Sequence, residues 1–233
     1  MKVLVIIPAY NEEANIQSVV NDLIENYPQY DYIIINDNST DQTQKICNDN
    51  NFNYVSFPTN LGIGGGVQAG YKYALENGYD IAVQHDGDGQ HDPYYIADVI
   101  KPIINNESDI VVGSRFINNE GFQSSTARRF GINFLSRLIK LCSGARVSDV
   151  TSGFRAVNRK YISYYANNYP QDYPEPEAIV MAKLMDARIK EIPVIMRERA
   201  NGVSSINFGK SIYYMIKVSI AIVICRLTEH RRK

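Results

Sequence analysis

Residues 81–93 of the chain read IAVQHDGDGQHDP, a short apolar run followed by two aspartates that flank a glycine. The run at 81–83 is apolar throughout, which is typical of a strand buried on both faces of a parallel sheet. The glycines beside Asp86 and Asp88 let the backbone turn at the end of the strand, so that both carboxylates can converge. The stretch therefore predicts a parallel sheet with an acidic site at the end of one strand.

Converging carboxylates repel each other unless a cation lies between them. Hard oxygen ligands suit Mg²⁺ or Mn²⁺, and these ions also bind substrate phosphates. The alternative is an ordinary surface turn, because aspartate and glycine are common in turns. A calcium EF-hand is excluded, since no glutamate closes the loop at the required spacing.

Outward from this stretch, strand-like and helix-like segments alternate through the first half of the chain. The expected strands are residues 3–7, 32–35, 54–57, 81–83 and 110–112, and the expected helices are residues 13–26, 41–48, 65–77 and 93–105. This alternation predicts βαβ units and an α/β fold, with ligands at the carboxyl ends of the strands.

The second half is less regular. Residues 128–141 and 211–227 have the pattern of helices, and residues 154–157 that of a short strand. Residues 169–177 carry three prolines, so no long regular element is expected there. Residues 189–196 are predicted to form an edge strand, because Pro193 interrupts them.

Composition excludes several classes of protein. The 233 residues include 24 basic and 25 acidic ones, so the net charge of −1 gives no sign of a nucleic-acid binder. Cys47, Cys142 and Cys225 are far apart, which argues against a disulfide framework and a structural zinc site. The N-terminus reads as a core strand, not a signal peptide, and no run reaches the roughly 18 apolar residues of a membrane span.

Two more strand ends carry polar groups. Residues 8–13 (PAYNEE) follow the first strand and residues 36–41 (NDNSTD) follow the second. Helix capping accounts for Ser39, Thr40 and Asp41, but not for Tyr10 or Asp37. An aromatic ring and a carboxylate at one sheet edge favour binding of a base and a ribose.

The glycines of residues 60–70 (NLGIGGGVQAG) formally match a dinucleotide fingerprint. We reject that interpretation, because the fingerprint should follow the first strand. The glycines instead predict a helix that begins close to the nucleotide-binding strands.

Basic residues form the last group. Arg115 follows the strand at 110–112, Arg128 and Arg129 open the next helix, and residues 199–205 (RANGVSS) form a loop after the edge strand. A single surface arginine is usually only solvated, but three groups beyond strand ends favour a phosphate or pyrophosphate ligand.

Together these motifs resemble family 2 glycosyltransferases, in particular the branch similar to dolichol-phosphate mannosyltransferases, which glycosylates polyprenyl phosphates. Residues 7–12, 36–41, 86–91, 113–115, 149–155 and 199–205 carry the likeness in order along nearly the whole chain. The resemblance implies the GT-A fold, a UDP- or GDP-linked sugar donor, and Mg²⁺ or Mn²⁺. Residues 36–38 depart from the usual Asp-Asp-Gly, but Asp37 is kept.

The resemblance also implies roles for individual residues. Pro8, Ala9, Tyr10, Glu12 and Asp37 would hold the nucleoside, and Asp86, Asp88 and Gln90 would place the metal on the donor diphosphate. Arg115 and Arg129 would hold the acceptor phosphate and, with Asp88, act in catalysis. Arg199 and Ser205 would lie on a loop that closes over the donor.

The expected reaction is inverting transfer of a sugar to undecaprenyl phosphate for cell-surface polysaccharide synthesis. The acceptor phosphate is already anionic, so no strong base is needed. Transfer to a glycan hydroxyl is the alternative, and it needs a base, for which Glu175 and Glu177 are candidates. A sugar-nucleotide pyrophosphorylase and a non-catalytic nucleotide-sugar sensor are less favoured alternatives.

Two regions are expected along the chain, a GT-A catalytic domain at 1–209 and an amphipathic helix at 210–233. The helix would bind the cytoplasmic face of the cell membrane peripherally. The alternative is a helix that packs on the catalytic domain or against another copy in a homo-oligomer. Many relatives carry transmembrane helices after the catalytic domain, so a small separate membrane protein is a further expected partner.

Overall fold

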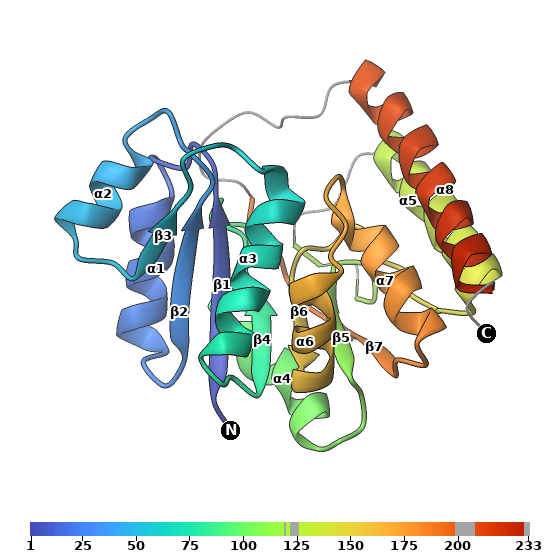
Figure 1. Cartoon of the computed structure of the whole chain (residues 1–233), viewed down its shortest axis with the longest axis horizontal. Helices are drawn as coiled ribbons and strands as arrows, with labels where there is room; N and C mark the ends of the chain where they lie inside the picture. The colour runs from blue at the N-terminus through green and yellow to red at the C-terminus, as the bar shows by residue number, and fades with distance from the viewer. Residues whose placement is uncertain (119, 122–125, 199–207, 231–233) are drawn as a thin grey trace.

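The computed structural model describes residues 1–118, 120–121, 126–198 and 208–230. Its centre is a seven-stranded sheet in the order β3-β2-β1-β4-β6-β5-β7 (Figure 1). The strands are β1 (Val3–Ala9), β2 (Asp31–Asn36), β3 (Tyr54–Ser56), β4 (Ile81–Gln84), β5 (Ile110–Ser114), β6 (Arg155–Asn158) and β7 (Ile189–Pro193). Only β6 runs against the others, so the sheet is mainly parallel, as expected.

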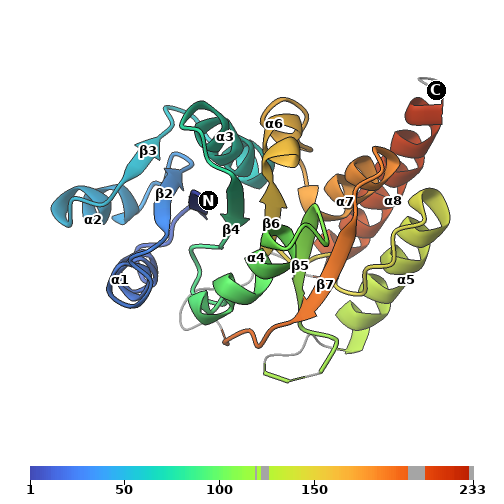
Figure 2. The ribbon, with the colours of Figure 1, turned by 90° about the horizontal axis from the view of Figure 1, so that it is seen from below.

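Helices cover both faces of this sheet (Figure 2). They are α1 (Ile16–Asn26), α2 (Thr43–Asp49), α3 (Gly62–Glu76), α4 (Ile96–Ile104), α5 (Thr126–Ser143), α6 (Arg159–Asn167), α7 (Pro174–Leu184) and α8 (Phe208–His230), with a 3₁₀ turn η1 (Pro93–Tyr95) before α4. Helices α1 and α4 lie on one face of the sheet and α3, α6 and α7 on the other, while α5 and α8 lie beyond α7 at the β7 end of the sheet.

Strand β1 shows why the sheet forms. Its side chains alternate between the two faces: Val5 joins the cluster with α1 and α4, and Ile6 joins the cluster with α3 and α6. Both residues are completely buried, so the apolar run is a strand covered on both faces. Residues of α5, α7 and α8, including Leu135, Ile179 and Val218, form a third cluster.

All five strands expected in the first half are present, and β7 lies at the edge of the sheet as Pro193 predicted. The sequence did not predict α6, and it expected no long regular element at residues 169–177, where helix α7 begins. Helix α7 begins at Pro174, so Glu175 and Glu177 lie in its first turn and not in a loop before it. Proline is tolerated there because the first turn has no intrahelical acceptors for its N–H groups.

Within the described residues, no helix has both the length and the apolar character needed to cross a membrane. Helix α8 starts at Phe208, and the expected division of the chain at residue 210 stays a prediction.

Candidate active site

The candidate site lies at the edge of the sheet where β1, β2, β4 and β5 end. Because β6 is antiparallel, the loop that precedes it, residues 149–154, comes to the same edge. Strand β1 pairs with β2 on one side and with β4 on the other, so the connections diverge at this point. Such a switch point is where open α/β sheets bind their ligands.

The loops after β1 and β2 are bonded to each other. Asn11, with a φ of 56°, receives the Thr40 N–H at 2.8 Å on its side-chain oxygen and donates its own N–H to Ser39 Oγ at 3.0 Å. The Glu13 N–H donates to Asp41 at 3.0 Å. Ser39, Thr40 and Asp41 therefore join two loops, and none of them is the N-cap residue of α2, which is Gln42.

Asp37 is buried beside this junction. Its N–H donates to the Ala9 carbonyl, and its Oδ1 accepts from the Leu61 N–H at 2.7 Å. The expected nucleoside residues are thus brought together: Asp37 and Ala9 are joined by a backbone bond, while the Tyr10 ring beside them is half exposed. This arrangement leaves an aromatic face and a fixed carboxylate at one point of the edge.

Helix α3 comes as close to these strands as its glycines predicted. A Cβ at Gly70 would clash with the Ile6 side chain of β1, and a Cβ at Gly64 would clash with the carbonyl oxygens of Pro170 and Gln171. Gly64 also donates its N–H to Gln171 at 3.2 Å. Only glycine permits both approaches.

The acidic motif forms a tight turn after β4. Asp88 Oδ1 accepts from the Gln90 N–H at 3.0 Å, and Asp86 Oδ1 accepts from Gln84 Nε2 at 3.2 Å. A Cβ at Gly153 would lie 2.6 Å from Asp86 Oδ2, so the glycine leaves room for this carboxylate. Two partly exposed carboxylates with such room are suitable oxygen ligands for a divalent cation. Among the described residues, no three His, Cys, Asp or Glu side chains form a ready-made metal cluster.

Two buried histidines lie beneath this turn. The Asp86 N–H donates to His91 Nδ1 at 2.9 Å, so His91 supports the backbone of the acidic motif. Neither ring nitrogen of His85 has a hydrogen-bond partner among the residues that the structure describes. Its ring packs edge-on against His91 and Phe154, with centroids 5.5 Å and 5.9 Å away. Burial lowers the pKa of His85 to about 3, so the ring is neutral.

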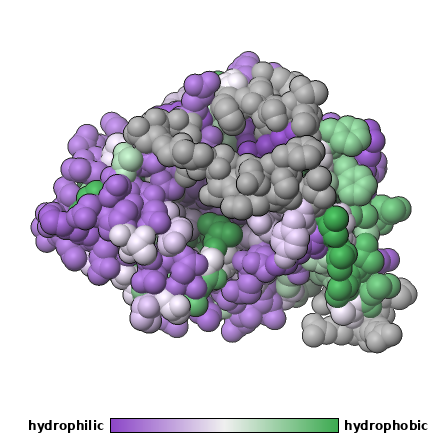
Figure 3. All heavy atoms as spheres, turned by 90° about the horizontal axis from the view of Figure 1, so that it is seen from above, coloured by the Kyte–Doolittle hydropathy of each residue, from purple (hydrophilic) through white to green (hydrophobic). Residues whose placement is uncertain are grey.

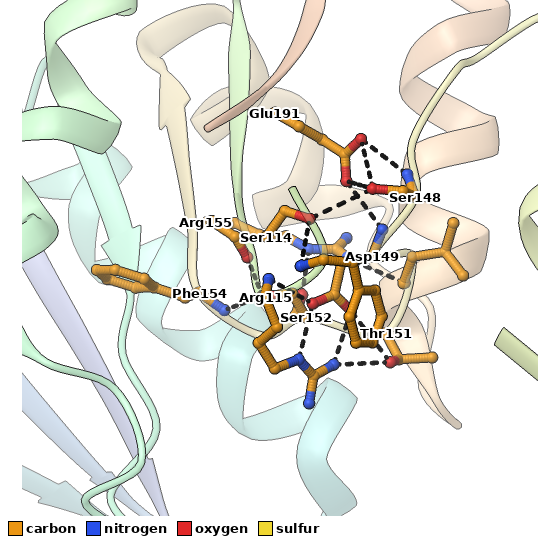
Figure 4. A network of polar contacts seen from close by, with 12 residues as sticks. Ser114, Arg115, Ser148, Asp149, Thr151, Ser152, Phe154, Arg155 and Glu191 are labelled. Carbon is orange, nitrogen blue, oxygen red and sulfur yellow. Dashed lines mark hydrogen bonds and ion pairs between the residues drawn. The ribbon is translucent and has the colours of Figure 1, made fainter. Parts of the chain in front are cut away.

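Arg115 is held in a buried ion pair (Figure 4). Its Nε donates to Asp149 Oδ2 at 2.7 Å, and its Nη2 donates to Asp149 Oδ1 at 2.6 Å and to Thr151 Oγ1 at 3.2 Å. The Arg115 side chain is 7% exposed and that of Asp149 is 0% exposed. The sequence singled out Arg115 but assigned no role to Asp149.

A further carboxylate supports this pair from the edge strand. Glu191 of β7 accepts from the Asp149 N–H at 2.8 Å and from the Ser148 N–H at 2.7 Å. Ser148 in turn contacts Ser114 at 3.3 Å, which closes the network shown in Figure 4. Nothing in the local sequence around Glu191 signals this contact, because its partners are more than 40 residues away.

Arg128 and Arg129 lie in the first turn of α5. The Arg129 guanidinium carbon is 3.4 Å from the centroid of the Phe116 ring, next along the chain from Arg115. Desolvation lowers the pKa of Arg128, and the positive charge of Arg115 lowers it further. Arg129 therefore lies close to Arg115, with the Phe116 ring as the contact. Arg128, to which the sequence gave no separate role, adds a third positive charge near Arg115.

Of the two candidate bases, Glu175 lies nearer the acidic motif. Burial raises its pKa, the nearby Arg155 charge opposes that rise, and the Asp86 charge adds to it. Arg155 is itself buried, and it donates to the carbonyls of Ser152, Val150 and Glu175 at 2.7–3.0 Å. The pKa of Glu177 is raised first by burial and then by the negative charge of Asp172, which lies outside the acidic motif.

Arg199 and Ser205 lie outside the described residues. The segment that leads to them is attached to the acidic motif at Arg197, whose N–H donates to the Gln90 carbonyl at 2.9 Å. The Arg197 guanidinium also pairs with Asp92 at 2.9 Å and with Asp22 at 3.2 Å. The sequence did not single out Arg197.

Residues 4–165 match the model of the family described as Glycosyl transferase family 2. The chain is 38% identical to the UDP-N-acetylglucosamine–dolichyl-phosphate N-acetylglucosaminyltransferase of Methanococcus voltae, over 82% of this chain and 84% of that protein. It is 27% identical to the undecaprenyl-phosphate mannosyltransferase of Micrococcus luteus, over 90% and 89%.

The fold has solved counterparts. Glucosyl-3-phosphoglycerate synthase of Mycobacterium tuberculosis, crystallised with Mn²⁺, UDP-glucose and phosphoglyceric acid, superposes with a TM-score of 0.68 at 20% identity. The match covers 97% of this chain and 79% of that one. The expected GT-A fold is confirmed, and the family match spans most of the chain that builds the sheet edge. This chain belongs to glycosyl transferase family 2.

Proposed function

We propose that this glycosyltransferase moves a sugar from a nucleotide sugar to the phosphate of a polyprenyl phosphate. The observation that carries the proposal is the meeting, at one sheet edge, of an acidic turn and a group of arginines. Asp86 and Asp88 lie after β4, and Arg115 lies after β5 with Arg128 and Arg129 nearby. The relatives named for transfer to dolichyl phosphate and undecaprenyl phosphate support this choice of acceptor.

The donor would lie over β1, β2 and β4. Asp37 and Tyr10 would hold the nucleoside, and Asp86, Asp88 and Gln90 would hold Mg²⁺ or Mn²⁺ on the diphosphate. When bound, such an ion neutralises the negative charge that develops on the leaving diphosphate. Solved proteins of the same fold that contain Mn²⁺ or Mg²⁺ together with UDP support a divalent ion here.

The acceptor phosphate would lie against the arginines. One of its oxygens attacks the anomeric carbon, the bond from that carbon to the diphosphate oxygen breaks, and the nucleoside diphosphate leaves with the bonding electrons. Attack opposite the leaving group inverts the anomeric configuration. Because the phosphate oxygen is already anionic, no side chain has to remove a proton.

Transfer to a glycan hydroxyl remains the second candidate, and the position of Glu175 favours it. A hydroxyl needs a base, and a carboxyl whose pKa is raised by burial beside Asp86 is suited to that task. Membership of family 2 leaves no reason to retain the pyrophosphorylase or the non-catalytic sensor.

The test is a donor screen with undecaprenyl phosphate. The purified chain is incubated with UDP- and GDP-linked sugars and Mn²⁺, and lipid-linked sugar is followed by chromatography. We expect one donor to label the lipid. Labelling of a glycan but not of the lipid would overturn the proposal in favour of the second candidate.

A lipid acceptor would place the enzyme at the cytoplasmic face of the membrane as a peripheral protein. The homo-oligomer and the small membrane partner stay predictions, and the proposal depends on neither.

A further inference from the structure

Helices α5 and α8 form a pair that projects from the end of the molecule beyond β7 (Figures 1 and 2). Their inner sides are buried against each other and against α7, through residues such as Leu135 and Ile139 of α5 and Val218 and Ile222 of α8. Part of α8 is therefore packed on the catalytic domain, as one of the two interpretations of this helix required.

The outer sides of the same helices are apolar and exposed. On α5, Phe130 and Leu141 are 76% and 84% exposed. Further exposed apolar side chains are Phe134 of α5 and Tyr213, Ile216, Ile220, Val223, Ile224 and Leu227 of α8. Their spacing of three or four residues, or multiples of it, places them on one side of each helix. We call this surface the α5–α8 face, and Figure 3 shows hydrophobic residues gathered at this end of the molecule.

Positive charge is concentrated around the α5–α8 face. Residues 126–146 and 213–228 contain seven of the 24 basic residues of the chain and none of its 25 acidic ones. Arg137, Lys140 and Arg226 are exposed, whereas Lys217 is paired with Asp172. The rest of the chain has 17 basic and 25 acidic residues, so positive charge is concentrated where the exposed apolar side chains are.

Large exposed apolar patches on soluble proteins mark interaction sites, and a basic border selects an anionic partner. A second copy of the chain fits poorly, because a two-fold contact would place the same basic surface against itself. A bilayer with anionic headgroups satisfies both features, since apolar side chains enter the acyl boundary while arginine and lysine stay at headgroup level.

We propose that the α5–α8 face docks on an anionic lipid bilayer, with α5 contributing as much as α8. This proposal deepens the proposed function and rests on it for the identity of the acceptor. The first turn of helix α5 holds Arg128 and Arg129, close to Arg115. The exposed apolar side chains of the face follow along the same helix. One helix thus connects the arginines at the sheet edge to the docked surface, so a lipid phosphate reaches the site from the headgroup layer.

The test measures cosedimentation of the full chain with vesicles of phosphatidylcholine alone and of phosphatidylcholine with phosphatidylglycerol. The variants are Leu141→Glu on α5 and Ile220→Glu on α8, and the matched control is Ile104→Glu on α4, a residue 48% exposed outside the face. We expect the wild type and the control to bind the anionic vesicles, and each face variant to bind at least about tenfold more weakly. Circular dichroism checks that all variants fold.

Three outcomes would overturn the proposal: equal binding by Leu141→Glu and wild type, binding that does not depend on phosphatidylglycerol, or a wild-type dimer in light scattering that Leu141→Glu converts to a monomer. The vesicles contain neither sugar donor nor polyprenyl phosphate. A failed donor screen with intact vesicle binding would therefore reject the proposed function alone, and the reverse result would reject the docking alone.

Discussion

Arg115 and Asp149, 34 residues apart in the chain, form two parallel charge-assisted hydrogen bonds of 2.7 Å and 2.6 Å in the interior of the protein. Removing one partner of a buried pair leaves the other charge uncompensated, which typically costs about 3–5 kcal/mol. We expect Asp149→Asn to lower the free energy of unfolding by an amount of that order, measured by urea denaturation. Asp49→Asn is the control: it breaks the exposed Lys45–Asp49 pair and should cost less than about 1 kcal/mol. Equal effects of the two substitutions would contradict the assignment of Arg115–Asp149 as a structural ion pair.

Asp88→Asn tests the metal site. Loss of one carboxylate ligand should weaken Mn²⁺ binding in calorimetry and lower kcat by about 10²-fold or more, because charge on the leaving diphosphate is no longer neutralised. Asp98→Asn, on the exposed side of α4, is the control and should behave as wild type. Full activity in EDTA would show that no divalent ion is needed.

Arg129→Ala tests the acceptor site. A charge-assisted bond to phosphate contributes about 1.5–3 kcal/mol, so the KM for polyprenyl phosphate should rise by about ten- to 150-fold while donor affinity stays unchanged. Lys72→Ala, an exposed residue of α3 outside the α5–α8 face, separates this effect from a general loss of positive charge. If calorimetry showed an equal loss of donor affinity in Arg129→Ala, the arginine would have to be assigned to the donor diphosphate.

Glu175→Gln separates the two candidate acceptors. With a polyprenyl phosphate acceptor the anionic nucleophile needs no base, so kcat should change by less than about tenfold. With a hydroxyl acceptor the loss of a general base should lower kcat by about 10²–10⁴-fold. Parallel assays with both acceptors decide the question, and Glu177→Gln, in the same helical turn, serves as the control.

His85→Met should stabilise the protein. Both ring nitrogens of His85 are buried without a hydrogen-bond partner in the described part of the chain, and an unsatisfied buried polar group costs about 1–3 kcal/mol. The pKa of His85 is about 3 in the folded chain, against an ordinary 6.5, so below pH 6.5 the unfolded chain binds more protons. Wild-type stability should therefore fall as the pH drops from 6.5 towards 3, and the gain from the substitution should grow over the same window.

Urea denaturation of metal-free protein at several pH values measures this difference. A pH-independent gap between His85→Met and wild type would show that protonation of His85 does not contribute. A variant that is less stable than wild type above pH 6.5 would show that packing against His91 and Phe154 outweighs the missing hydrogen bonds.

The sequence alone determined the sheet and much of the sheet edge. Each short apolar run is a local signal, because a strand that is buried on both faces is apolar at every position. All five strands of the first half were therefore predicted from the sequence. The acidic motif after β4 was also local, since two aspartates and their glycines lie within one turn. The same local reasoning was wrong about α7, because prolines in a first helical turn look like proline in a loop.

Tertiary structure decided which side chains meet. Asp149 became the partner of Arg115, and Glu191 the support of Asp149, only because antiparallel β6 and edge strand β7 bring distant segments to β5. The burial of His85 and the side-by-side placement of α5 and α8 depend in the same way on packing between elements far apart in sequence. Periodicity records which face of an element is apolar, but contacts between elements depend on the summed packing of the whole core, which no local window of sequence contains.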